Sequence, residues 1–186
     1  MSNEREALAV VASLMELAAR TAPKGKGVDT ILVRILTDEE REDLAACLTA
    51  LGKERNTGFF LRDAVNIRRA GGCIIIGSKG RVVTGIDCGA CGYQTCRAME
   101  AACRETREIM TPFKSPNCAV RITDLGIALG SAVKTAQIHN VDNRIMYSGG
   151  VAAIHLGLLG TDCTVAYAIP ISASGKNIFF DREPAK

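Results

Sequence analysis

Apolar residues recur every three or four positions near the start of the chain. Leu8, Val11 and Met15 follow this spacing, which places their side chains on one face of a helix. Pro23 lies just beyond and cannot continue helical hydrogen bonding, so the pattern predicts that the helix ends before it. We therefore expect an amphipathic helix over residues 5–22.

Short, continuous apolar runs rich in β-branched residues predict buried strands. Ile31 to Leu36 and Cys73 to Ile76 are runs of this kind, and Gly80 marks a turn after the second run. The expected strands cover residues 31–36, 73–76, 82–86 and 164–171.

Capping and composition predict the other helices. Thr37 is followed three residues later by Glu40, a capping box that predicts a helix ending near Leu51. Further helices are expected over residues 59–70, 95–109, 119–138 and 142–157, the last one apart from Gly149-Gly150.

The predicted elements follow the order α-β-α-α-β-β, a cysteine-rich loop, and then α-α-α-β. This order indicates an α+β fold, an α/β sandwich in which helices cover a sheet. A chain of 186 residues is long enough to form one domain, residues 1–186, with its own core. We expect residues 80–118 to be a cysteine-rich segment inserted into this domain.

Composition and charge narrow the class of protein. Hydrophobic residues make up 47% and charged residues 23% of the chain, which is ordinary for a soluble globular protein. The net charge of +3, the lack of Trp and the aromatic content of 4% argue against a nucleic-acid-binding surface. No apolar run approaches the ~20 residues of a membrane helix, and the first residues lack the signal-peptide pattern. We expect a cytoplasmic protein that binds neither nucleic acid nor membrane.

The candidate chemistry lies in the run Cys88-Gly89-Ala90-Cys91-Gly92-Tyr93-Gln94-Thr95-Cys96. Two residues between the first two cysteines let both sulfurs face one point, and the glycines let backbone N–H groups approach them. Where thiols stay reduced, clustered cysteines favour metal or redox roles over disulfides. Thiolates select zinc, copper(I) or an iron–sulfur cluster, and this spacing is related to the iron–sulfur signatures. No second Cys or His pair follows, so the run is not a zinc finger.

A [4Fe-4S] cluster needs a fourth thiolate besides Cys88, Cys91 and Cys96. Cys103 lies two helical turns after Cys96, about 10 Å along the axis, which is a long reach for one compact cluster. Cys118 follows Ser-Pro-Asn in a loop that can fold back. We therefore predict the ligands Cys88, Cys91, Cys96 and Cys118. Structural zinc on four thiolates is the alternative.

Residues 87–96 resemble the Asn-Cys-Gly-Ala-Cys-Gly-Tyr segment of the small four-iron domain found in corrinoid iron–sulfur and electron-transport subunits. In that domain, three clustered cysteines and one later cysteine bind a [4Fe-4S] cluster, so the resemblance implies the same cluster here. The gap of 21 residues between Cys96 and Cys118 is longer than usual in that domain. Nearly the whole chain resembles a bacterial and archaeal family of ferredoxin-domain proteins without a settled activity, through residues 22–29, 59–63 and 124–134.

A further resemblance is to flavin-dependent nitroreductases. The run Ala18-Ala19-Arg20-Thr21-Ala22-Pro23-Lys24-Gly25-Lys26 is similar to their Ala-Pro-Ser loop, and residues 124–171 are similar to their closing helices and last strand. The resemblance implies a nitroreductase-like sandwich and a homodimer, for which the small residues of 126–132 permit close helix packing. It also implies FMN, with its phosphate near Arg20, Lys24, Lys26 and Arg182. The Arg-Arg-Ser-x-Arg motif that holds this phosphate in nitroreductases is absent here.

These patterns predict an iron–sulfur redox protein that uses a [4Fe-4S] cluster for electron transfer, with FMN as a second cofactor to be tested. Its partner would be a redox protein or a small-molecule acceptor, and its enzyme class would be a flavin- or cluster-dependent oxidoreductase. The alternative is a zinc-stapled structural or binding domain without redox activity.

Overall fold

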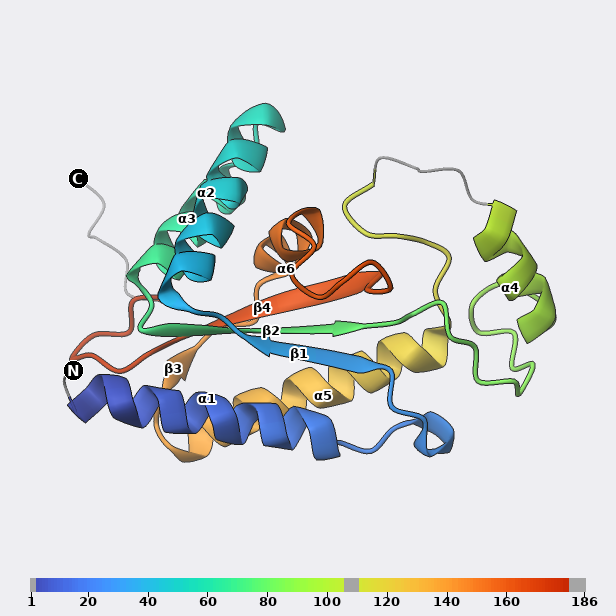
Figure 1. Cartoon of the computed structure of the whole chain (residues 1–186), viewed down its shortest axis with the longest axis horizontal. Helices are drawn as coiled ribbons and strands as arrows, with labels where there is room; N and C mark the ends of the chain where they lie inside the picture. Colours follow the sequence, from blue (N-terminus) through green and yellow to red (C-terminus); the bar gives the residue numbers. More distant parts are fainter. Residues whose placement is uncertain (1–2, 106–110, 181–186) are drawn as a thin grey trace.

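The computed structural model describes residues 3–105 and 111–180, and Figure 1 shows the whole chain. Its helices are α1 (Asn3–Thr21), the short 3-10 helix η1 (Gly25–Gly27), α2 (Asp38–Glu54), α3 (Gly58–Arg69), α4 (Cys96–Glu105), α5 (Ala119–Ile138) and α6 (Tyr147–His155). Its strands are β1 (Ile31–Ile35), β2 (Gly72–Ser78), β3 (Asp142–Asn143) and β4 (Val165–Ser172). Helices and strands are mixed along the chain, which confirms the predicted α+β class.

The strands of the described residues form one antiparallel sheet of four strands in the order β1-β2-β4-β3. β2 is an inner strand: Ile76 lies opposite Val33 of β1 on one side and opposite Tyr167 of β4 on the other. β1 and β3 form the two edges of the sheet.

Helices cover both faces of this sheet (Figure 1). α1 and α5 pack together on one face, and α2, α3 and α6 cover the other. Side chains of β2 alternate between the two layers: Cys73 and Ile75 contact the second layer, and Ile74 and Ile76 contact the first. All four side chains are fully buried. A strand buried on both faces has apolar residues at consecutive positions, which is why the sequence pattern predicted β2.

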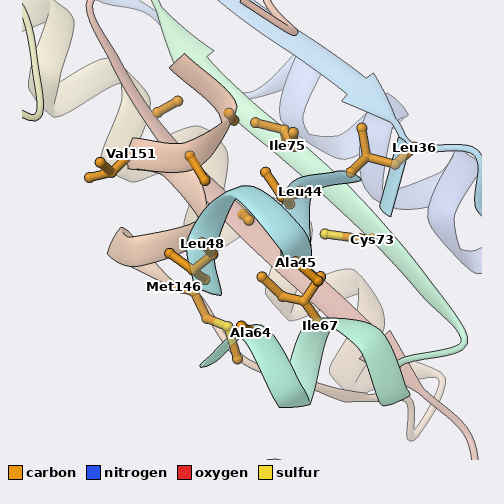
Figure 2. Close-up of a cluster of buried hydrophobic side chains, with 14 of the residues drawn as sticks. Leu36, Leu44, Ala45, Leu48, Ala64, Ile67, Cys73, Ile75, Met146 and Val151 are labelled. Atoms are coloured by element: carbon orange, nitrogen blue, oxygen red, sulfur yellow. The ribbon is translucent and has the colours of Figure 1, made fainter. Parts of the chain in front are cut away.

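Figure 2 shows the core under α2, α3 and α6. Leu44 and Leu48 of α2, Ile67 of α3 and Ile75 of β2 belong to one cluster of buried hydrophobic side chains there, together with Met146. The first four are fully buried and Met146 is nearly so. This core stabilises the sandwich without any contribution from the clustered cysteines.

Residues 82–86 do not form the expected strand. The chain leaves the sheet after Ser78, and the Val82 N–H donates to the Lys79 carbonyl in a turn. Val82 and Ile86 are exposed, at 41% and 51%. β2 already has a neighbour on each side, so another strand has no place beside it.

The region 142–157 also differs from the single interrupted helix that was expected. β3 comes first, and α6 then runs from Tyr147 to His155 directly through Gly149 and Gly150. The other predicted helices and strands agree with the structure to within a few residues. The end of the expected helix 95–109 lies outside the described residues. Within residues 3–105 and 111–180, no helix combines the length and apolar character needed to cross a membrane.

Candidate metal centre

The segment of residues 80–118 leaves the sandwich after Gly80 and rejoins it from Phe113, which packs against both hydrophobic clusters, to Cys118. The Cys118 N–H donates to the Gly80 carbonyl at 2.7 Å, and the Gly80 N–H donates to Thr164 Oγ1 at 3.0 Å. The Thr164 hydroxyl donates to Asn117 Oδ1 at 2.6 Å. A Cβ at Gly80 would lie 2.2 Å from Asn117 Oδ1, so this packing requires glycine. The two ends of the segment are therefore fixed to each other and to the start of β4.

α4 lies away from the sandwich, at one end of the molecule (Figure 1). Its Met99 side chain is fully buried, yet it belongs to neither of the two hydrophobic clusters that flank the sheet. Met99 therefore lies outside the two cores of the sandwich. A segment with so little apolar core is of the kind that metal ligands stabilise.

Tight turns shape the loop that carries the clustered cysteines. Asp87, Gly89 and Gly92 have positive φ angles of 46°, 72° and 88°. The Gly92 N–H donates to the Gly89 carbonyl at 2.9 Å, which closes one turn around Cys91. The Asp87 carboxylate accepts the Cys96 N–H at 2.7 Å and satisfies a free donor at the start of α4. The sequence therefore folds this loop back on itself directly before the helix.

The three clustered cysteines lie at or near the surface. Cys88 is exposed, and Cys91 and Cys96 are half-buried. Within residues 3–105 and 111–180, no three His, Cys, Asp or Glu side chains are arranged to hold a metal ion. The sulfurs would have to draw together around a shared metal. The donor set fits such a group in its chemistry, because it consists of soft thiols on a loop of tight turns.

The predicted fourth ligand, Cys118, is buried at the start of α5, where it is the N-cap residue. Its sulfur lies 3.7 Å from the Thr84 hydroxyl. Burial alone would raise the pKa of this thiol, but the backbone N–H groups of Arg121, Thr84 and Val120 and the Thr84 hydroxyl outweigh burial and lower the pKa. The N–H groups at the start of α5 act by proximity, since the sulfur makes no capping hydrogen bond. The lowered pKa of Cys118 favours the thiolate, which is the form that binds metal.

Cys103, the alternative fourth ligand, also faces this region. Its thiol lies 3.7 Å from the Pro116 carbonyl oxygen, two residues before Cys118. Burial raises the pKa of Cys103, the charge of Arg81 opposes that rise, and the nearby Cys91 thiol adds to it. The assignment of Cys118 as the fourth ligand stays a prediction.

Two of the residues predicted to hold a flavin phosphate have partners within the protein. Arg20 donates to Asp29 Oδ2 and to the Ile31 carbonyl, both at 2.7 Å. Lys24 is only 6% exposed and donates to the Ala22 carbonyl at 2.8 Å. Both cations therefore stabilise the end of α1. Lys26 is exposed on η1 with a positive φ of 56°, and Arg182 lies outside the described residues.

One buried ion pair joins the loop after α1 to the inserted segment, and sequence reasoning missed it. Arg121 Nη1 lies 3.0 Å from Asp124 Oδ2, and their side chains are 1% and 4% exposed. Arg121 also donates to the Gly25 carbonyl at 3.0 Å and to the Val82 carbonyl at 3.1 Å, and Asp124 accepts the Gly25 N–H at 2.8 Å. A charged pair three residues apart in the otherwise small and apolar run 119–138 was the signal that could have revealed it.

The fold is that of the nitroreductase-like flavoproteins. A BluB-like flavoprotein from Clostridium difficile 630 aligns with a TM-score of 0.60 at 13% identity, over 100% of this chain and 85% of that one. An FMN-dependent nitroreductase from Clostridium difficile R20291 aligns with a TM-score of 0.53 at 16% identity, over 95% of this chain and 78% of that one. Nitroreductase A from Vibrio parahaemolyticus aligns with a TM-score of 0.53 at 10% identity, and this chain covers 60% of its length. At these identities the likeness defines the fold.

The sequence defines the family. Residues 114–182 match the family described as "Uncharacterized protein containing a ferredoxin domain (DUF2148)". An uncharacterised protein from Archaeoglobus fulgidus is 42% identical over 183 residues, which cover 98% of this chain and 96% of that protein. The chain belongs to this family of ferredoxin-domain proteins. The matched range contains Cys118 but not Cys103 or the three clustered cysteines.

Proposed function

We propose that this protein transfers single electrons through a [4Fe-4S] cluster bound by Cys88, Cys91, Cys96 and Cys118. The observation that carries the proposal is the position of these thiols. Two lie on one tightly turned loop outside the hydrophobic core, and the third begins α4 directly after that loop. The fourth is a thiol of lowered pKa where the segment rejoins the sandwich. Membership of a ferredoxin-domain family supports the same chemistry.

Different residues of the chain would bind the cluster, tune its reduction potential and leave it accessible to a partner. The thiolates would hold the cluster, which when bound supplies a site that gains and loses one electron. Gly89 and Gly92 would let the backbone stay close to the sulfurs, and hydrogen bonds to the sulfurs would tune the reduction potential. The exposed position of Cys88 would leave one side of the site open to a partner, either a redox protein or a small-molecule acceptor.

A flavin is a second candidate cofactor, favoured by the fold shared with an FMN-dependent nitroreductase. Lys26 is an exposed cation of the predicted phosphate site, on a loop whose Gly27 backbone lies open. FMN fluorescence would be followed while the protein is added, with Lys26→Gln compared with Lys53→Gln on α2. Quenching that weakens only in Lys26→Gln would support flavin binding at this loop. No quenching at FMN concentrations of about 10 μM to 100 μM would leave the cluster as sole cofactor.

We also propose a homodimer. The outer side of α5 exposes Gly126 and Gly130, and a Cβ at either position would meet nothing within 4 Å. Light scattering at micromolar concentration should give twice the mass of the chain, and a single-chain mass would contradict the proposal.

Three cysteine variants test the ligand set after anaerobic reconstitution with iron and sulfide. Cys118→Ser should lose the cluster or hold a smaller one, whereas Cys103→Ser should keep nearly full iron and the visible absorption of the wild type. Cys47→Ser, a half-buried thiol on α2 outside the segment, is the control and should match the wild type. Loss of the cluster in Cys103→Ser, with nearly full iron in Cys118→Ser, would instead identify Cys103 as the fourth ligand.

Reversible one-electron reduction is the functional measurement. The reconstituted protein should show a paramagnetic signal on reduction that disappears on reoxidation. A protein that binds zinc in these positions would show neither colour nor signal, and it would instead be a zinc-stapled structural or binding domain.

A further inference from the structure

A pocket with a volume of about 330 Å³ lies at the base of the inserted segment. Three separate stretches of chain line it. Lys79 and Arg81 come directly after β2, Lys114 precedes α5, and Thr161 and Asp162 precede β4. A volume of this size is at the lower end of the range for small-molecule sites.

Positive charge dominates the lining of this pocket. Among the described residues that line it, three are cations, Lys79, Arg81 and Lys114, and one is a carboxylate, Asp162. Lys79 Nζ lies 3.2 Å from Asp162 Oδ2, but the two side chains are 40% and 71% exposed, so solvent weakens the pair. Lys114 donates to the Thr161 carbonyl at 2.7 Å, which orients its amine without neutralising it. Two of the three positive charges therefore have no carboxylate partner within the lining of the pocket.

Arg81 has an unused donor. Its Nη2 donates to the Ser115 carbonyl at 2.9 Å, which fixes the direction of the guanidinium. Its Nε is buried, and within residues 3–105 and 111–180 it has no hydrogen-bond partner. A buried donor without an acceptor is unfavourable, and an ordered water or a ligand that enters the pocket would supply the acceptor.

We propose that this pocket binds the phosphate group of a small molecule through Arg81, assisted by Lys79 and Lys114. Arginine presents several donors in one plane and matches the oxygens of a phosphate, whereas lysine adds positive charge from a flexible stem. The pocket carries an excess of about two positive charges, and a phosphate monoester carries about two negative charges near neutral pH.

The pocket borders the cysteine-rich segment. Arg81 donates to the Ser115 carbonyl, and the Cys103 sulfur lies 3.7 Å from the carbonyl oxygen of the next residue, Pro116. A ligand held by Arg81 would therefore bind beside the segment that carries the proposed cluster. The pocket is formed by protein side chains alone, so phosphate binding does not require iron, sulfide or flavin.

Calorimetric titration of the full chain with inorganic phosphate tests the proposal, at constant ionic strength and both with and without iron. Arg81→Gln and Lys114→Gln should each weaken binding about tenfold, the effect of losing one charge-assisted hydrogen bond. Lys134→Gln, an exposed lysine on α5 outside the pocket, is the matched control and should bind as the wild type does.

Asp162→Asn gives a test in which phosphate binding is expected to become tighter rather than weaker. Removal of the Asp162 charge should tighten phosphate binding about fivefold, since a repulsive charge is gone. The proposal is overturned if phosphate binds no better than chloride, or if binding is the same in Arg81→Gln, Lys114→Gln and Asp162→Asn. Circular dichroism of each variant separates lost binding from lost folding.

The phosphate could belong to a cofactor such as FMN or to a separate small molecule, and a competition arm distinguishes the two sources. If phosphate displaces FMN, and Lys114→Gln weakens the binding of both phosphate and FMN, the pocket holds the phosphate of the flavin. If phosphate binds without affecting FMN, or FMN does not bind, the ligand is a separate phosphorylated molecule.

Discussion

Single residues connect the loop after α1, the inserted segment and α5. Arg121 and Asp124 form a buried ion pair, and Arg121 also holds the carbonyls of Gly25 and Val82. Removal of one partner from a buried pair leaves the other charge without compensation, which costs far more than the pair contributes. The same side chain therefore fixes two segments that lie far apart in the sequence.

We predict that Asp124→Ala lowers the free energy of unfolding by about 3 kcal/mol, because Arg121 stays buried and charged. Urea unfolding followed by circular dichroism measures the change. Asp43→Ala, an exposed carboxylate on α2, is the control and should change stability by less than about 0.5 kcal/mol. Similar stabilities of the two variants would show that the pair does not hold these segments.

Glu40 completes the capping box that begins α2, and this role is sensitive to pH. The Thr37 N–H donates to Glu40 Oε2 at 3.0 Å, and the Glu40 N–H donates to Thr37 Oγ1 at 3.1 Å. The Thr37 N–H first and then Arg34 lower the pKa of Glu40 below 4.5. The ionised Glu40 carboxylate therefore stabilises the fold at pH values above its ordinary pKa of 4.5. This stabilisation is lost as the pH falls through the lower pKa that Glu40 has in the folded state.

Glu40→Gln should accordingly be less stable than the wild type at neutral pH, by about 0.5 kcal/mol to 1 kcal/mol. The difference should shrink as the pH falls from neutral through the lowered pKa of folded Glu40, because the wild-type side chain then loses its charge. Denaturant unfolding of both proteins across this range measures it. A difference that is independent of pH would contradict the role given to the charge.

At the scale of whole elements, the contact between α6 and β4 depends on glycine. A Cβ at Gly150 would lie 1.7 Å from the carbonyl oxygen of Ala166, and a Cβ at Gly149 would lie 2.5 Å from the Ala168 side chain. The clash at Gly150 is with backbone, which cannot rotate away as a side chain can. Close packing of this helix on the sheet therefore requires that glycine.

We predict that Gly150→Ala destabilises the protein by at least about 3 kcal/mol or prevents folding. Gly58→Ala at the start of α3 is the matched control, because a Cβ there meets nothing within 4 Å. That variant should be as stable as the wild type or slightly more stable, since alanine favours the helix. Thermal unfolding of the two variants compares them, and a tolerant Gly150 would refute the close contact.

The same elements show how far the sequence predicts this fold. The periodic helix α1, the helix α5 with its small apolar composition, and the doubly buried strand β2 were predicted closely because local sequence and tertiary burial agree there. The glycines in α6 were taken as an interruption, since propensity alone disfavours them in a helix. The apolar run 82–86 was taken as a strand because a local pattern does not show that β2 already has two neighbours.

The candidate site was predictable only in part, for the same physical reason. Spacing identified Cys88, Cys91 and Cys96 as candidate ligands because these three cysteines lie close together in the sequence. The choice between Cys103 and Cys118 depends on how the chain returns to the sandwich, and spacing alone does not determine this. The pocket lined by Arg81 and Lys114 arises from three distant stretches of chain, so no local motif indicated it.

At the scale of the whole molecule, the sandwich has two cores, and the inserted segment contributes to neither through α4. We therefore predict that removal of iron loosens residues 80–118 and leaves the sandwich folded. Amide hydrogen exchange should speed up in this segment, while Ile74, Ile75 and Ile76 of β2 stay protected. Circular dichroism should retain most of its helical signal, and global unfolding without iron would contradict this account.

The metal content of the protein tests the central claim most directly. Anaerobically reconstituted protein, freed of unbound ions, would be analysed for iron, acid-labile sulfide and zinc per chain. A [4Fe-4S] cluster predicts about four iron and about four sulfide per chain with little zinc. About one zinc per chain, with no bound iron or sulfide, would contradict the redox function and leave a zinc-stapled domain.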